Sequence, residues 1–230
     1  MSEDNNYQEN IDHIEIEEQV LRIPQNRVGV IIGKNGSTKK LIEEKAKIVL
    51  DIESTDGTVH IKPMKNDDDP IHVWIARDII KAIGRGFSEE KALKLLDQDY
   101  YLDIITLEHD TNRLRQLRGR VIGEGGRTRR IIEQSTLSHI SVQGKTIAII
   151  GYIEEVPVAK RAIEMLIDGN RHSTVYKFLE RHRMERKQEE TKIWKDKIAV
   201  KDGVPNTDAI EFDYYEGELD TKNLDEPDNN

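Results

Sequence analysis

The chain has 230 residues, of which 36% are apolar and 5% aromatic, and its formal net charge is −9. Because it contains no cysteine, it has no disulfide, no thiolate metal site and no cysteine nucleophile. No segment approaches the ~20 apolar residues of a membrane span, and the N-terminus lacks the basic start and apolar run of a signal peptide, so we expect a cytoplasmic protein without a membrane partner.

The first half of the chain is predicted to hold one small domain. Residues 1–11 are polar, acidic and without periodicity, which is typical of a disordered segment. Residues 12–87 then show the order strand, helix, helix, strand, strand, helix, with Gly33 ending the first helix and Pro70 at the start of the last. The six elements are predicted at residues 14–23, 28–32, 37–47, 49–53, 58–62 and 71–83.

The second half repeats this order after a connecting helix. Ser88 is placed to cap a linking helix over residues 88–98, and the six elements return over residues 99–170 through an arginine-rich loop. A final helix is predicted over residues 171–198, before an acidic tail at residues 199–230. Its apolar stripe, which we expect to pack on the second domain, consists of Val175, Phe178, Leu179 and His182. This histidine is predicted to be packed or solvated and not a ligand.

The repeated order reflects an internal duplication. Residues 28–42 read VGVIIGKNGSTKKLI and residues 118–132 read RGRVIGEGGRTRRII, each with an Ile-Gly-x-x-Gly core followed by basic and then apolar residues. The similarity continues through the two following strands, and the turn between these strands is shorter in the second copy. A repeat of this length predicts two domains of about 80 to 90 residues.

The negative charge lies near the two ends of the sequence. Residues 1–19 carry seven acidic groups and no Lys or Arg, and residues 208–230 carry nine acidic groups and one lysine. Residues 113–130, by contrast, carry seven arginines and one carboxylate, Glu124. Most charge runs are solvated helix faces, but arginines beside a glycine loop favour a phosphate-binding patch.

Each Gly-x-x-Gly loop has the features of a site for a sugar-phosphate backbone. Two glycines between two short helices leave backbone N–H groups exposed at the start of the second helix, whose dipole favours negative charge. Lysines and arginines downstream add positive charge, and neighbouring apolar side chains form a groove for unstacked bases. The predicted RNA-binding residues are Ile32, Gly33, Lys34, Asn35, Gly36, Lys39, Lys40 and Ile52 in the first copy, and Arg118, Arg120, Ile122, Gly123, Glu124, Gly125, Gly126, Arg127, Arg129, Arg130 and Val142 in the second.

These residues carry a resemblance to KH domains. Both copies resemble the eukaryotic-type, or type I, KH topology, in which the Gly-x-x-Gly loop holds the backbone of about four nucleotides. The resemblance implies an α+β fold of two tandem domains, each a three-stranded antiparallel sheet packed on three helices, with a C-terminal helix and an acidic tail. The junction IIKAIGRGFSEEKALKLL at residues 79–96, followed by DQDYYLDIITL, resembles the archaeal and eukaryotic small-subunit ribosome assembly factors called partner of NOB.

The resemblance also implies a function and partners. Proteins of this family are expected to bind single-stranded RNA near the 3′ end of small-subunit (16S) ribosomal RNA, and to guide an end-processing nuclease without being the catalyst. Other ribosome or translation-initiation factors are candidate partners. No cofactor or metal is expected, because Gly33-Lys34 does not complete a phosphate-loop motif and the seven histidines form no metal-ligand pattern.

Alternatives stay open at three points. Glu124 places a carboxylate where phosphate should pass, so that either Arg120 and Arg127 compensate for it or the loop contacts RNA differently. The intact first loop fits the archaeal branch of the family, and this loop binds either RNA or a protein. The rival functions are a KH regulator of messenger RNA, a subunit of an RNA-degrading complex, and a protein scaffold that docks through the acidic tails.

Overall fold

The computed structural model describes residues 18–64, 69–108 and 110–199, with side chains up to Lys192. Contacts divide the chain into two units. The first unit comprises Met1–Ile104 and Ser141–Ile150, and the second unit comprises Ile105–Ile140 and Gly151–Asn230. The predicted disordered segment at residues 1–11 and the acidic tail lie outside the described residues, apart from Ala199.

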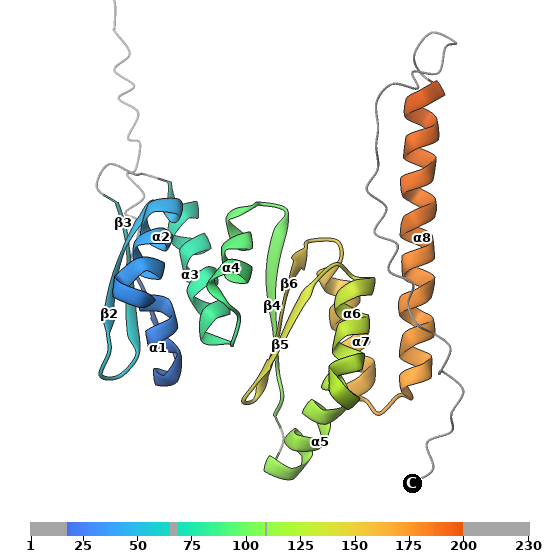
Figure 1. Cartoon of the computed structure of the whole chain (residues 1–230), viewed down its shortest axis with the longest axis horizontal. Helices are drawn as coiled ribbons and strands as arrows, with labels where there is room; N and C mark the ends of the chain where they lie inside the picture. The colour runs from blue at the N-terminus through green and yellow to red at the C-terminus, as the bar shows by residue number, and fades with distance from the viewer. Residues whose placement is uncertain (1–17, 65–68, 109, 200–230) are drawn as a thin grey trace, which may run out of the picture. The chain divides into compact units, whose positions relative to one another are not determined.

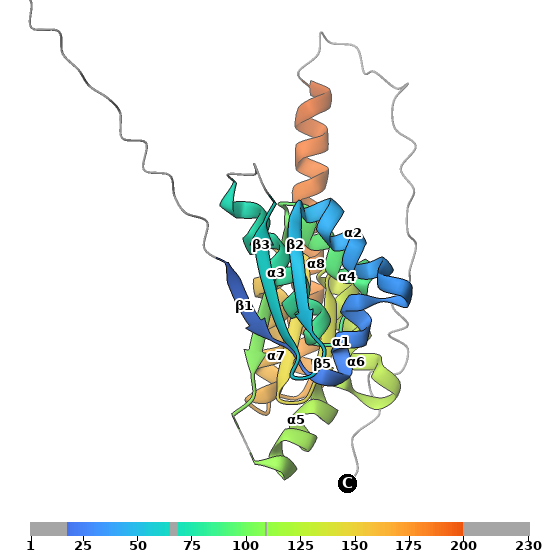
Figure 2. The same cartoon turned by 90° about the vertical axis from the view of Figure 1, so that its left-hand side faces the viewer.

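The helices and strands follow the predicted order twice (Figure 1 and Figure 2). The first series is β1 (Gln19–Arg22), α1 (Gln25–Ile32), the short helical turn η1 (Lys34–Gly36), α2 (Ser37–Ala46), β2 (Ile48–Glu53), β3 (Thr58–Pro63) and α3 (Pro70–Gly84). The connection is α4 (Glu89–Ala92) and the helical turn η2 (Leu93–Leu96). The second series is β4 (Tyr100–Thr106), α5 (Thr111–Ile122), η3 (Glu124–Gly126), α6 (Arg127–Ser135), β5 (His139–Gln143), β6 (Thr146–Tyr152) and α7 (Val156–Ile167), followed by α8 (His172–Ala199).

The first sheet is antiparallel and has the order β1-β3-β2 (Figure 2). Leu50 lies opposite Ile61 and Ile52 opposite Val59, so that alternate residues of neighbouring strands share a face. Of these residues Leu50, Val59 and Ile61 are buried, and Ile52 is half-buried. The alternation of apolar and polar residues in these strands therefore reports a sheet with one face on the core, and the three-stranded antiparallel sheet that the resemblance implies is confirmed.

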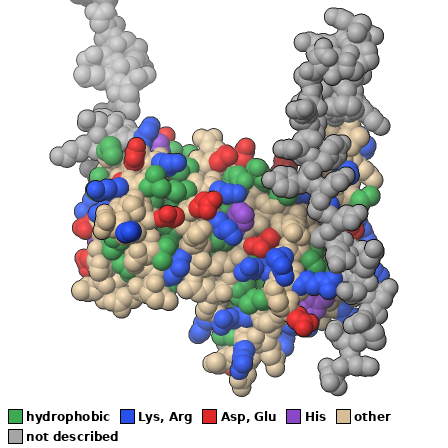
Figure 3. All heavy atoms as spheres, in the orientation of Figure 1, with side chains coloured by type: hydrophobic (Ala, Val, Ile, Leu, Met, Phe, Trp, Pro, Cys, Tyr) green, Lys and Arg blue, Asp and Glu red, His purple; other side chains and the backbone are tan. Residues whose placement is uncertain are grey.

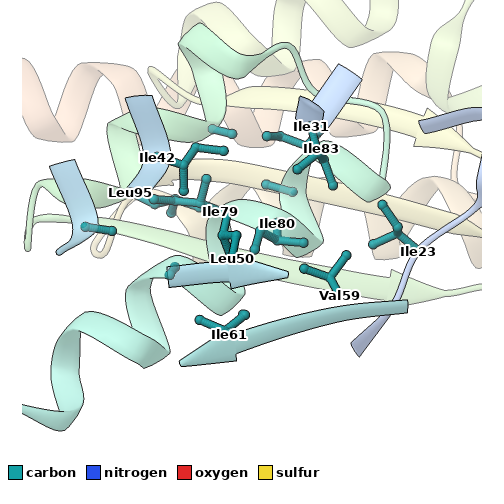
Figure 4. Close-up of a cluster of buried hydrophobic side chains, with 14 of the residues drawn as sticks. Ile23, Ile31, Ile42, Leu50, Val59, Ile61, Ile79, Ile80, Ile83 and Leu95 are labelled. Carbon is teal, nitrogen blue, oxygen red and sulfur yellow. The ribbon is translucent and has the colours of Figure 1, made fainter. Parts of the chain in front are cut away.

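Helix α3 supplies six buried residues of the apolar cluster on this sheet (Figure 4). Asp69 caps its N-terminus by accepting a hydrogen bond from the Ile71 N–H at 3.0 Å. Ile79, Ile80 and Ile83 repeat at the spacing of one helical face, and all three are fully inaccessible to solvent. Helices α1 and α2 contribute to the same buried cluster. The first glycine loop, which joins these two helices, is therefore positioned by this core.

The second sheet has the order β4-β6-β5, and its central strand is buried on both faces. Ala148 and Ile150 belong to the apolar cluster of the first unit together with Leu102 of β4. Ile147 and Ile149 point to the opposite face and are also fully buried. This explains why β6 is a continuous apolar run and does not alternate as β2 does.

Two elements differ from the sequence predictions. Helix α1 begins at Gln25, directly after Pro24, three residues before its predicted start. Most of the arginine-rich segment is also helical, because Asp110 caps α5 by accepting a hydrogen bond from the Arg113 N–H at 2.9 Å. Arg113–Arg120 therefore lie on this helix and not in the loop, and their side chains point in several directions around it.

The C-terminal helix α8 is held on the second unit by apolar and charged contacts. Val175 and Leu179 are buried, in agreement with the predicted stripe. Beside them, the Glu155 carboxylate accepts hydrogen bonds from His182 Nε2 at 2.9 Å and from Arg186 Nη1 at 2.8 Å, with only 9% of its side chain exposed. No helix in the described part of the chain is long and apolar enough to cross a membrane.

Candidate nucleic-acid interface

The two Gly-x-x-Gly loops have nearly the same backbone conformation. The φ angles are 71°, 54° and 77° at Gly33, Asn35 and Gly36, and 71°, 55° and 77° at Gly123, Gly125 and Gly126. All six lie in the left-handed region, which glycine adopts freely and asparagine tolerates better than other residues. The duplication therefore produces the same loop shape twice.

The first glycine of each loop is required by internal packing. A Cβ atom added at Gly33 would lie 2.7 Å from the backbone nitrogen of Thr38, and one added at Gly123 would lie 2.8 Å from that of Thr128. In both cases the added carbon would also collide with the threonine hydroxyl. These glycines therefore let the loop fold tightly over the first turn of α2 or α6.

The last glycine of each loop instead faces open space. A Cβ at Gly36 or Gly126 would meet no atom within 4 Å, so these positions need glycine for their φ angle alone. No side chain caps α2 or α6, which begin directly after these glycines. Because the first N–H groups of a helix have no partner within it, these uncapped ends are suited to bind an anion.

Around the first loop the predicted contact residues carry positive charge. Lys34 and Lys40 are exposed, and Lys39 lies 3.9 Å from Glu43 one turn further along α2. The Glu43 side chain in turn accepts a hydrogen bond from the Leu50 N–H at 2.9 Å. Lys34 and Lys40 therefore stand apart from the ion pair between Lys39 and Glu43 and are available to a phosphate.

Around the second loop the charges are arranged differently. Glu124 is exposed at the position that matches Lys34. Arg130 donates from Nη2 to the Gly125 carbonyl at 3.0 Å, which holds its guanidinium against the loop. Arg129 lies 3.6 Å from Glu133, and Arg118 is half-buried, with an Nε atom that is inaccessible and has no hydrogen-bond partner. On the face drawn in Figure 3, Lys and Arg side chains are frequent over the helices of the second unit.

Arg120 has a structural role that the sequence analysis missed. Its Nε donates to Leu166 O at 3.1 Å and its Nη2 to Asn170 O at 2.6 Å, at the end of α7. Arg27 does the same in the first unit, where it donates to Ile83 O at 2.8 Å and to Phe87 O at the end of α3. Burial lowers the pKa of Arg27, although an arginine remains protonated at neutral pH. Since the Arg120 guanidinium is occupied in this way, its compensation for Glu124 stays only a prediction.

The apolar residues predicted to receive bases are half-buried in both copies. Ile32 and Ile52 pack against the edge of the first unit's core and keep part of their surface exposed. Ile122 and Val142 have the same intermediate exposure. This combination of anchoring and exposure suits apolar contact with unstacked bases, and base contact at these four residues stays a prediction.

Two buried threonines beneath the loops were not predicted. Thr38 and Thr128 are each 3% exposed and lie at matching positions of the duplicated sequence. The signal that could have identified them is that both copies keep a threonine two residues after the last glycine of the loop. Among the described residues, no group of His, Asp or Glu side chains could hold a metal ion.

Comparison with known proteins matches both halves of the chain to one domain type. Residues 17–85 match the KH domain, and residues 100–184 match the eukaryotic-type KH domain (KH-domain type I) in the form of the second KH domain of PNO1. A KH domain-containing protein of Methanocaldococcus jannaschii is 46% identical over 201 residues, which cover 84% of this chain and 88% of that protein.

Two crystal structures from Pyrococcus horikoshii are similar to this chain. Dim2p has 48% sequence identity and a TM-score of 0.67, covering 72% of this chain and 99% of that one. The structure of a complex of a/eIF2alpha, aDim2p and rRNA has 47% identity and a TM-score of 0.69, covering 74% of this chain and 95% of that one.

Proposed function

The chain belongs to the family of KH-domain proteins that includes archaeal Dim2p and PNO1, and from this premise we propose that it binds single-stranded ribosomal RNA during maturation of the small ribosomal subunit. The observation that carries the proposal is the repeated loop geometry. Each loop ends in a glycine with open space beside it and continues into an uncapped helix N-terminus. A sugar-phosphate backbone can approach both closely.

The bound region is the 3′ end of 16S ribosomal RNA. The partner-of-NOB junction at residues 79–96 and the relative crystallised with rRNA support this choice. The same relative is in complex with a/eIF2alpha, which supports a translation-initiation factor as a partner of this chain too. The protein guides the nuclease that trims this RNA end and does not cut the RNA itself.

The two loops attract phosphate through different residues. The first loop offers Lys34 and Lys40 close to its uncapped helix, so its attraction for phosphate comes from the loop tip itself. The second loop carries Glu124 at the tip and gains its positive charge from Arg130, which lies against Gly125. Phosphate should therefore pass nearer the tip of the first loop and nearer the arginine side of the second.

Loop variants of the full chain test the proposal. Replacing Lys34 and Asn35 by an Asp pair, and separately Glu124 and Gly125 by an Asp pair, should weaken binding of single-stranded RNA while leaving the circular dichroism spectrum unchanged. The first pair adds two carboxylates to its loop, and the second adds one beside the carboxylate that Glu124 already supplies. An exposed lysine away from the loops, Lys62 on β3, replaced by Asp is the matched control. Unchanged affinity in both loop variants would remove the loops from the mechanism.

Crosslinking in cells tests the identity of the RNA. RNA recovered with the wild-type protein should be enriched in the 3′ end of 16S ribosomal RNA, and the enrichment should fall in the loop variants. Recovery of dispersed messenger RNAs at equal levels would contradict a ribosomal role and favour a KH regulator instead.

A further inference from the structure

The beginning of α8 contacts the helices on both sides of the second Gly-x-x-Gly loop. His172 Nε2 lies 3.1 Å from the Arg120 carbonyl, in the last turn of α5 before the loop. The Tyr176 hydroxyl lies 2.9 Å from Thr128 Oγ1, in the first turn of α6 after the loop. His172 and Tyr176 are four residues apart and therefore share one face of α8, where their rings lie 6.2 Å apart.

The tyrosine contact fixes the residue on which the loop lies. Thr128 is 3% exposed, and its hydroxyl occupies the space where a Cβ of Gly123 would be. The rotamer of Thr128 therefore determines how closely Gly123 can approach α6. Because a buried hydroxyl without a partner is unfavourable, the Tyr176 hydroxyl stabilises the rotamer that the tight loop requires.

The histidine contact completes the helix that enters the loop. The last carbonyl groups of a helix have no partner within it, and Arg120 O is one of these in α5. A carbonyl oxygen can only accept, so His172 Nε2 carries the proton and donates it. The last turn of α5 and the first turn of α6 are thus attached to the same face of α8.

The first unit has the same arrangement with different chemistry. Thr38 is 3% exposed beneath Gly33, as Thr128 is beneath Gly123. Its hydroxyl donates to the carboxylate of Glu89, in the first turn of α4. In each copy, then, the element that follows the last helix of the repeat supplies the partner for the threonine under the loop. Glu89 and Tyr176 differ in residue type, so what the two copies share is the target of the contact, the threonine under the loop.

We propose that Tyr176 and His172 are positioning residues, which hold the second Gly-x-x-Gly loop in its RNA-binding conformation, so that α8 belongs to the RNA site without touching RNA. This inference rests on the proposed function. A loop that already has its bound shape loses less conformational entropy on binding, so loosening it lowers the affinity.

Three variants of the full chain separate this role from direct RNA contact. Tyr176→Phe removes only the hydroxyl and leaves the Thr128 hydroxyl unpartnered, Thr128→Val removes the partner, and the double variant removes both. Tyr101→Phe, at an exposed tyrosine of β4, is the matched control. The probe is a fluorescently labelled single-stranded RNA of about eight nucleotides, twice the length that one loop holds.

Tyr176→Phe should weaken RNA binding about fivefold, and the double variant should bind no worse than this, because the unpartnered hydroxyl is then gone. Without RNA, hydrogen exchange at the amides of residues 123–128 should be faster in Tyr176→Phe than in Tyr101→Phe. His172→Ala should accelerate exchange in the same segment.

The outcomes distinguish the inference from the function on which it rests. If the wild-type protein fails to bind the RNA, the proposed function is lost and the inference with it. If the wild-type protein binds but Tyr176→Phe leaves either the affinity or the loop exchange unchanged, the inference alone is overturned. Losses that multiply in the double variant would also overturn it, since they would show that the two hydroxyls act independently.

Discussion

Replacing Glu124 by lysine tests whether phosphate passes the tip of the second loop. Glu124 is exposed and the two loops share one backbone conformation, so the change adds two units of positive charge without a change of shape. For a phosphate about 6 Å away in water, Coulomb's law gives about 0.7 kcal/mol per unit charge, or about 1.4 kcal/mol in total. At about 0.15 M salt, screening reduces this to about 0.7 kcal/mol, a threefold gain in affinity, and at about 0.01 M salt the gain is about sevenfold.

The assay is a titration of labelled single-stranded RNA by fluorescence anisotropy over a series of salt concentrations. If the lysine makes one new phosphate contact, the slope of log K against log salt steepens by about 0.7. Glu124→Gln changes the charge by one unit and should give about half the gain in free energy. Equal affinity and equal slope for the wild type and both variants would show that phosphate lies too far from Glu124 to be affected by its charge, and the estimate for a separation of about 6 Å would be wrong.

Three further predictions concern stability and the roles of the arginines. Glu155→Ala leaves His182 and Arg186 without their shared carboxylate and should lower the free energy of unfolding, measured by urea denaturation, by about 3 kcal/mol. A loss below about 1 kcal/mol would show that these three side chains do not form a buried ionic contact. Gly57→Ala should lower the free energy of unfolding by about 2 kcal/mol in the same assay, because φ at Gly57 is +79° and the added carbon would collide with a backbone carbonyl. An unchanged free energy of unfolding would show that the backbone is not strained by a side chain at this position. Arg120→Ala should lower the free energy of unfolding by about 1 kcal/mol and leave the slope of log K against log salt for RNA binding unchanged. A slope flatter by about 0.7 would instead show that Arg120 contacts a phosphate.

The features that the sequence predicted well are local and repeated. The glycine pattern predicts a tight loop because few residues other than glycine adopt positive φ. The pattern occurs twice in matching surroundings, which predicts two similar domains. The alternation in β2 and the helical spacing of Ile79, Ile80 and Ile83 in α3 are also local patterns, and both coincide with the faces that the structure buries.

The features that it did not predict depend on contacts between distant residues. Arg120 looked like a phosphate contact because a charge run has no intrinsic direction, and only the position of the α7 carbonyls gives its guanidinium a partner. The bond between Tyr176 and Thr128 joins residues 48 positions apart, and neither residue has an unusual neighbour in the sequence. The start of α5 at Thr111 was not predicted, because its cap at Asp110 lies outside the duplicated segment.

The paired arginines at the ends of α3 and α7 limit how the two repeats can be exchanged. Each arginine reaches the carbonyl of the next-to-last residue of its helix and the carbonyl four residues further on, yet Arg27 lies six residues before its loop glycine and Arg120 only three. Helix α3 has 15 residues and α7 has 12. The arginine that binds the end of the shorter helix lies about one turn closer to its loop glycine, on α5, than Arg27 does on α1. A chimera that replaces α7 by α3 should therefore also replace α5 by α1. If α3 were transplanted alone, the carbonyl groups at its end would lie about one turn away from the Arg120 guanidinium. The two repeats therefore differ together in the length of the closing helix and in the position of the arginine that binds its end.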